Sequence, residues 1–240
     1  MAVMILLAVA HSAFWAWALM LGVGAGLVGG AGAALVVLWL VLLGAWAVFV
    51  GRLARSGWLA GPGITTWPAF WVSGPAVTLS LLALILLPTF REAFVGSLGL
   101  LPATTIPMLN ALRILAVGTV VKAARGQLPK RIGLGVGIPD MSFGVWSLVI
   151  AVNGGFASTE AAVAWHAVGA GILLLMIPAV FTALRQPRLD APGKGDARAI
   201  LRFPLVLAPA GLALPFLILH AVVIGVYLAT GTLVGRIAES

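Results

Sequence analysis

Charged residues are scarce in this sequence. Lys, Arg, Asp and Glu together make up 8% of its 240 residues, whereas hydrophobic residues make up 62%. A soluble domain usually carries about 25% charged and about 45–50% apolar residues. A chain of this composition could not cover a water-exposed surface with polar side chains. The sequence therefore excludes an ordinary soluble protein and predicts one that is surrounded mainly by lipid.

Cysteine is absent, which excludes disulfide bonds and thiolate metal ligands. The sequence also lacks the Walker, HExxH and G-x-S-x-G motifs that mark common catalytic sites. A G-x-G-x-x-G match over residues 24–29 lacks the preceding strand and the later acidic residue that a dinucleotide site needs. We therefore assign no catalytic residue, and we favour a protein that is not an enzyme.

Seven apolar runs are long enough to cross a bilayer, because a spanning helix needs about 20 predominantly apolar residues. The sequence therefore predicts an all-α, polytopic transmembrane helix bundle in which residues 1–240 form a single transmembrane domain. The last run contains Pro204, Pro209 and Pro215, and proline inside a helix should tilt or kink it. The expected spans are about 2–22, 32–51, 69–90, 104–124, 132–153, 160–184 and 203–231.

Basic residues gather on one side of this seven-span arrangement, which is typical of the cytoplasmic side of a membrane protein. Only Arg91 and Arg236 belong to the opposite side. This distribution predicts a cytoplasmic N-terminus, an external C-terminus and a cytoplasmic loop over 185–198. It also explains the net charge of +8 without nucleic-acid binding. The residues on the basic side are Arg52, Arg55, Lys122, Arg125, Lys130, Arg131, Arg185, Arg188, Lys194, Arg198 and Arg202.

Two charged residues fall well inside expected spans, away from their ends: Arg113 in the fourth and Asp140 in the fifth. A charge at mid-bilayer costs at least about 2.5–3.5 kcal/mol, so such residues usually face the bundle interior and pair. Counting about 1.5 Å per residue from the helix ends places both at depths that the long arginine side chain can bridge. We therefore expect a contact that is direct or passes through one water. It would be a structural ion pair, the floor of an internal polar cavity, or both.

The helix that carries Asp140 contains unusual residues just before it. Gly133, Gly135 and Gly137 expose the backbone, and Pro139 leaves an earlier carbonyl without its hydrogen-bond donor. Irregular backbone at membrane depth is tolerated where it is buried in protein or lines a cavity. The pattern is equally compatible with a locally loosened helix at Asp140 and with close helix packing through small residues.

All three histidines also fall inside expected spans: His11 in the first, His166 in the sixth and His220 in the seventh. Each could bond to a neighbouring helix, relay protons or bind a metal or haem. By residue counting, the depths of His166 and His220 differ by about five residues, which disfavours a haem between them. Asn110 lies three positions before Arg113 and shares its helix face. The candidate binding residues are therefore Arg113, Asp140, Asn110, His220, His166 and His11, with no metal site expected and the cofactor unknown.

Three segments carry a resemblance to a family of bacterial multi-span membrane proteins of unknown function. The segment "GQLPKRIGLGVGIPDMSFGVWSLVIA" (126–151) is similar to a pattern in which an L-P dipeptide and a glycine-rich stretch precede an aspartate that opens a helix. The segments "AWHAVG" (164–169) and "RFPLVLAPAGLALPFLILHAV" (202–222) resemble the last two spans. Pro139 and His166 stand where the family more often has glycine and asparagine. The resemblance implies that Asp140, Arg113 and His220 belong together and that the protein lies in the bacterial inner (cytoplasmic) membrane.

The sequence leaves three functions open. The first is binding or translocation of a small solute, ion or lipid-like molecule through a cavity in the bundle. The second is a redox role, with haem or quinone bound by the membrane histidines. The third is a structural or assembly role in a membrane complex. The expected partners are the lipid bilayer, a small-molecule ligand, and a membrane protein or a second copy of the chain; nucleic acid is not among them.

Overall fold

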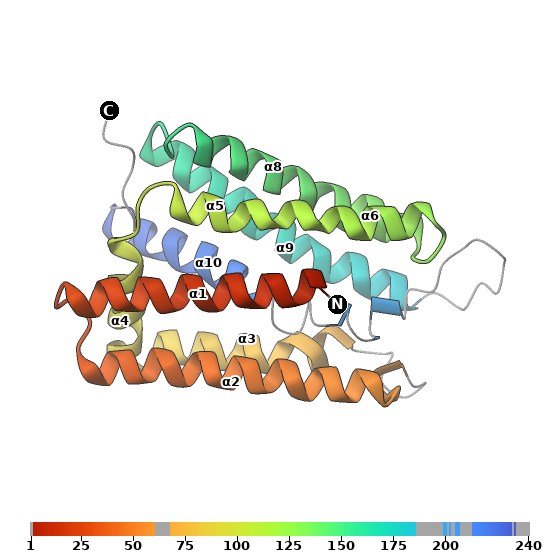
Figure 1. The fold of residues 1–240 in the computed structure, drawn as a ribbon, viewed down its shortest axis with the longest axis horizontal. Coiled ribbons are helices and arrows are strands. Elements are labelled where there is room, and N and C mark those ends of the chain that lie inside the picture. Colours follow the sequence, from red (N-terminus) through yellow and green to blue (C-terminus); the bar gives the residue numbers. More distant parts are fainter. Residues whose placement is uncertain are drawn as a thin grey trace.

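The structure of this chain is a computed structural model, and it describes residues 2–60, 68–185, 199–200, 202, 205–206, 213–231 and 233. Within these ranges the chain forms helices joined by turns, without a β-strand. The long helices lie side by side along the long axis of the molecule, and α4 lies across one end (Figure 1). The elements are α1 (Ala2–Gly24), α2 (Gly30–Arg55), η1 (Trp58–Ala60), α3 (Pro68–Leu86), α4 (Pro88–Gly99), α5 (Thr105–Ala111), η2 (Leu112–Ala116), α6 (Val117–Ala124), α7 (Lys130–Ile132), η3 (Gly133–Gly137), α8 (Ile138–Val152), α9 (Thr159–Arg185) and α10 (Ala213–Thr230).

Two of the long rods are composite. The elements α5, η2 and α6 follow one another without a break, and η2 is a tight 3₁₀ turn between two α-helical pieces. The elements α7, η3 and α8 also form one rod, and η3 is a wide π-helical turn. Each rod is long and apolar enough to cross a membrane.

The length and apolar character of the described helices indicate a membrane protein. Six of them are long and apolar enough to cross a bilayer, and the number rises to seven if a bent pair of helices forms one further span. The all-helical architecture expected from the sequence is therefore confirmed. The seven crossings and the orientation of the termini stay predictions, because length and composition do not fix them.

The third expected span was wrong at its end, because it was drawn as a straight run to residue 90. The helix α3 ends at Leu86, and the chain turns through 98° into α4. Pro88 has no backbone N–H and disfavours a helical backbone at the residue before it, and Leu87 is indeed non-helical. The sequence analysis did not anticipate α4 as a separate helix.

The last expected span, over 203–231, is described only at 205–206 and 213–231. The described helix α10 begins at Ala213, and residues 205–206 form a turn. Pro215 lies in the first turn of α10, where a missing N–H breaks no intrahelical bond, so Pro215 introduces no kink. Pro204, Pro209 and most of the 185–198 loop lie outside the described residues.

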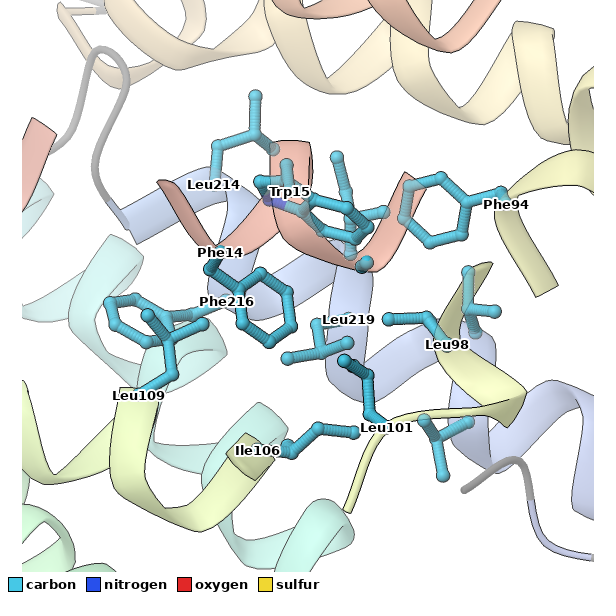
Figure 2. Close-up of a cluster of buried hydrophobic side chains, with 14 of the residues drawn as sticks. Phe14, Trp15, Phe94, Leu98, Leu101, Ile106, Leu109, Leu214, Phe216 and Leu219 are labelled. Carbon is cyan, nitrogen blue, oxygen red and sulfur yellow. The ribbon is translucent and has the colours of Figure 1, made fainter. Parts of the chain in front are cut away.

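Aromatic side chains hold one half of the bundle together. The ring of Trp15 on α1 lies 4.6 Å from that of Phe94 on α4, and the ring of Trp39 on α2 lies 5.9 Å from that of Phe90 on α4. Figure 2 shows this α1–α4 contact continuing to Phe216 on α10. Large buried aromatic rings in mutual contact stabilise such a core beyond their buried area. The other half, built from α5, η2, α8, α9 and α10, contains the buried side chains of Arg113, His166 and His220.

Glycine allows the two composite rods to approach closely. A Cβ on Gly144 of α8 would clash with the backbone nitrogen of Ile114 and lie 2.8 Å from the carbonyl carbon of Arg113 in η2. A Cβ on Gly137 would lie 2.8 Å from the side chain of Val120 on α6. Small residues commonly serve this purpose between membrane helices. Before Asp140, Gly133 and Gly137 thus pack closely against α6, as the small-residue alternative expected, whereas a Cβ on Gly135 would meet nothing within 4 Å.

Candidate functional site

The two charged residues of the fourth and fifth spans form an ion pair. Arg113 Nε donates a hydrogen bond to Asp140 Oδ1 at 2.6 Å, so η2 and α8 are joined by opposite charges. A hydrogen bond between ionised partners at this distance is among the stronger ones in proteins. The direct contact expected from the sequence is confirmed. Whether it floors a cavity is still a prediction.

The ion pair continues into a chain of polar contacts with two histidines. Arg113 Nη1 lies 3.4 Å from His220 Nε2, and His220 Nδ1 lies 2.9 Å from His166 Nδ1. The four residues come from η2, α8, α10 and α9. We call Asp140, Arg113, His220 and His166 the Arg113 network.

The donors and acceptors of this network follow from the arginine. A guanidinium group has only donors, so His220 Nε2 must accept from Arg113. Neutral His220 then carries its proton on Nδ1 and donates it to His166 Nδ1. Neutral His166 in turn carries its own proton on Nε2. The arginine therefore fixes the tautomers of both imidazoles.

The network is buried to different extents along its length. The side chain of Asp140 is 15% exposed and that of Arg113 is 2% exposed. His166 and His220 are fully enclosed. The carboxylate is thus the member nearest the bundle surface, and the histidines lie deepest. A molecule that reaches the network from outside would meet Asp140 first.

Aromatic rings surround the guanidinium and the imidazoles. The guanidinium carbon of Arg113 lies 4.3 Å from the ring centroid of Phe143 and 5.9 Å from that of Phe216. The ring of Trp165 lies 4.9 Å from Phe143 and 5.2 Å from His220. A cation over an aromatic face is stabilised by the ring electrons, more so away from water. These rings hold Arg113 in one orientation inside an apolar enclosure.

The two charged residues lie in or next to helical turns that are not α-helical. Arg113 lies within the 3₁₀ turn of η2, and Asp140 is the third residue after the π-helical turn of η3. Asn110 Nδ2 donates to Ile106 O at 3.0 Å and so shares a carbonyl with the helix ladder just before η2. Turns of both kinds inside helices are frequent at functional sites. The loosened helix expected before Asp140 is confirmed as η3.

A glycine makes room for the inner histidine. A Cβ on Gly169 of α9 would lie 2.5 Å from His220 Nε2 and 2.6 Å from Phe143 Cζ. Real Cβ atoms do not approach other atoms this closely. Gly169 therefore allows α10 to bring its imidazole against α9 and toward Arg113.

The expected depth difference of about five residues between the two histidines was too large. His166 lies seven residues after the start of α9 and His220 ten residues before the end of α10. The offset is three residues, or about 4.5 Å of helix, and two imidazoles span it. Their ring centroids are 5.0 Å apart and their planes make an angle of 73°. A haem held by both would need its macrocycle between them, and rings in direct contact leave no place for it.

Two of the candidate residues do not join the hydrogen bonds of the network. His11 Nδ1 donates to Leu7 O at 2.9 Å, and its ring meets the edge of Phe216. Asn110 bonds within its own helix. Within the described part of the chain, His11 Nε2, Asn110 Oδ1 and Arg113 Nη2 are buried without a hydrogen-bond partner. The described part of the chain also contains no cluster of three His, Cys, Asp or Glu side chains that could hold a metal ion.

No protein-family model, curated protein or solved structure matches this chain. The resemblance of residues 126–151 and 202–222 to a bacterial membrane family stays a prediction. The roles of individual residues therefore rest on geometry alone.

The sequence analysis missed the residues that shape the site. Phe143, Gly144 and Gly169 were not identified as candidates, although each lies against the network. Spacing carried a signal in two cases. Phe143 follows Asp140 by three positions and Gly169 follows His166 by three, so each pair shares a helix face.

Proposed function

We propose that this protein is an integral membrane protein that binds a small solute, ion or lipid-like molecule at the Arg113 network and moves it through a cavity in the helix bundle. The proposal rests on one observation. Four polar side chains from four elements meet inside an apolar bundle, and Arg113 Nη2 is buried there without a hydrogen-bond partner among the described residues.

The energetic cost of this arrangement supports a function. Replacing a buried ion pair by well-packed apolar residues is often neutral or stabilising, so stability alone does not require Arg113 and Asp140. An unpartnered donor in a site this deep adds a further cost of about 1–3 kcal/mol. Ionisable groups inside membrane helices commonly mark the paths of substrates, ions or protons.

The proposed topology has seven crossings, with the N-terminus in the cytoplasm of a bacterium and the C-terminus outside. In this arrangement α3 crosses the membrane and α4 lies along its outer surface. The basic residues of the connections α6–α7 and α2–α3 then fall on the cytoplasmic side, as the positive-inside rule requires.

A ligand screen by thermal unfolding tests the proposed binding. Small carboxylates, amines, sugars and inorganic ions are added one class at a time to the detergent-purified protein, because a ligand that binds only the folded state raises its unfolding temperature. We expect one class to stabilise the wild type and to have no effect on the Arg113→Gln/Asp140→Asn double variant. The same solute should enter proteoliposomes that contain the wild type.

The control is Arg125→Gln, which removes a basic residue exposed at the end of α6. This variant should respond to the solute as the wild type does. A screen in which no solute class stabilises the protein would contradict the proposal and favour an assembly role. Equal stabilisation of the wild type and the double variant would show that the ligand binds elsewhere.

A further inference from the structure

The guanidinium of Arg113 has one edge that is not firmly bonded. Its Nε is held by Asp140 at 2.6 Å. Its Nη1 makes only a long contact of 3.4 Å with His220, and Nη2 has no partner among the described residues. The two Nη atoms form the outer fork of the guanidinium, which matches the two oxygens of a carboxylate.

We propose that this fork binds a small monocarboxylate, and that each anion is bound together with one proton, which His220 takes up at Nε2. The inference rests on the proposed binding function and names the chemical class of its ligand. In the bound state the carboxylate accepts from Nη1 and Nη2 of Arg113 and also from the protonated His220.

Charge balance requires the proton. The network as it stands holds one negative charge on Asp140 and one positive charge on Arg113, so it is neutral overall. A second anion in an apolar enclosure would leave a net negative charge, which is costly where water is excluded. Uptake of one proton restores neutrality. The single guanidinium also explains the choice of a monoanion over a dianion.

His220 is the residue placed to take that proton. Its Nε2 accepts from Arg113 Nη1 through the longest contact of the network, and an anion on the fork would replace His220 there. Nε2 is then free to be protonated and to donate to the anion. At the other nitrogen nothing changes, because His166 Nδ1 already accepts from His220 Nδ1. His166 therefore acts as a positioning residue that stabilises doubly protonated His220.

Other titratable groups around α10 are less suited. Asp140 keeps the strong bond to Nε and faces Arg113 directly. His11 on α1 is separated from the fork by the ring of Phe216 and bonds to its own helix. Helix α3, which also packs against α10, carries no titratable residue.

The walls of the site limit the ligand to a small one. The backbone of α9 at Gly169 approaches His220 Nε2 so closely that a Cβ would lie 2.5 Å away. Phe143 covers one face of the guanidinium at 4.3 Å. A small carboxylate with a short apolar tail can accept hydrogen bonds from the two Nη atoms of Arg113 and place its tail against the aromatic rings.

Acetate is the probe, and acetamide is its uncharged control of the same shape. Binding of each to the detergent-purified full chain is measured by calorimetry, and proton uptake is measured in weakly buffered solution. We expect about one proton taken up per acetate bound. The affinity should then fall by about tenfold for each pH unit between about pH 6 and pH 8, because binding is linked to that proton. Acetamide should not bind.

Two histidine variants identify the proton site. In His220→Gln, which cannot take up the proton, acetate should bind much more weakly than in the wild type, and the remaining binding should occur without proton uptake and with little dependence on pH. In His166→Gln, the amide oxygen can still accept from His220 Nδ1, so proton uptake should persist. Gel filtration and thermal unfolding establish that both variants are folded. Uptake that persists in His220→Gln would overturn the assignment to His220, whatever the result for His166→Gln.

The remaining outcomes separate this inference from the function on which it rests. Acetate binding without proton uptake by the wild type would overturn the coupling. Equal binding of acetamide, or stabilisation by an amine or a sugar but not by acetate, would overturn the ligand class and leave a solute-binding function in place. If no solute of any class bound, the proposed function itself would fail.

Discussion

Gly169 of α9 lies directly against the imidazole of His220 on α10. Any side chain at this position would meet His220 Nε2, His220 Cε1 and Phe143 Cζ, all within 2.6 Å of a Cβ. The atom that accepts from Arg113 is thus the atom that packs on the glycine. Helix packing and the hydrogen bonds of the Arg113 network depend on the same contact.

Gly169→Ala should therefore displace the imidazole and break its contact with Arg113. Adding a methyl group to a well-packed interior typically costs about 1–3 kcal/mol. The control is Gly171→Ala on the same helix, where a Cβ would have nothing within 4 Å, and where alanine should be neutral or stabilise by up to about 1 kcal/mol. Thermal unfolding in detergent compares the two. Equal unfolding temperatures for both variants would contradict the close packing of His220.

The ion pair can be tested by a double-mutant cycle. Arg113→Leu and Asp140→Leu should each destabilise the protein by about 3–5 kcal/mol, because each leaves a buried charge without its partner. The double variant should recover much of this loss, since two apolar residues leave no buried charge behind. Unfolding in detergent gives the three values. Strictly additive losses would show that the two side chains do not interact.

The close approach of α8 to η2 leads to a third expectation. Gly144→Ala should destabilise the protein strongly, because a Cβ would press on the backbone of Arg113 and Ile114, which cannot rotate away. Gly118→Ala on α6, where a Cβ would meet nothing within 4 Å, serves as the control and should be harmless. The two variants are compared by unfolding temperature and by yield of folded protein. A harmless Gly144→Ala would mean that the two rods lie farther apart.

The proposed orientation is open to a direct test with paired reporters that are active on only one side of the membrane. A reporter inserted after Gln127, in the turn between α6 and α7, should signal from the cytoplasm. A reporter fused after Ser240, which lies outside the described residues, should signal from the outside. The expectation follows from the concentration of basic residues on one side. A cytoplasmic signal after Ser240 would exclude seven crossings.

The sequence was sufficient to predict the helical bundle and the pairing of Arg113 with Asp140. Both follow from the same energetic rule, because lipid tolerates neither open backbone groups nor single charges. Gly133, Gly137 and Pro139 likewise indicated that the helix before Asp140 could be irregular. In each case the physical signal lies in the residue types themselves and does not depend on where neighbouring helices end.

The contact between His166 and His220 could not be obtained in this way. Its prediction required helix ends accurate to one or two residues, because small errors at the start of the sixth span and at the end of the seventh add up to the difference between an offset of about five residues and the observed three. The bend before α4 depends on Pro88, but a proline near a helix end is also compatible with a straight span and a following loop. Gly144 and Gly169 stand out only when the facing helix is known.

Because of the wide turn of η3, the span that contains it cannot lose even one residue without changing the direction in which its later side chains point. A π-helical turn bonds residue i to i+5 and so takes in one residue more than an α-helical turn. Each residue of α-helix corresponds to about 100° of rotation. A chain with one residue fewer between Ile132 and Pro139 could keep Gly133 against Ala123 on α6, or Asp140 toward Arg113, but not both. A deletion here would change the phase of the helix while leaving its apolar character intact.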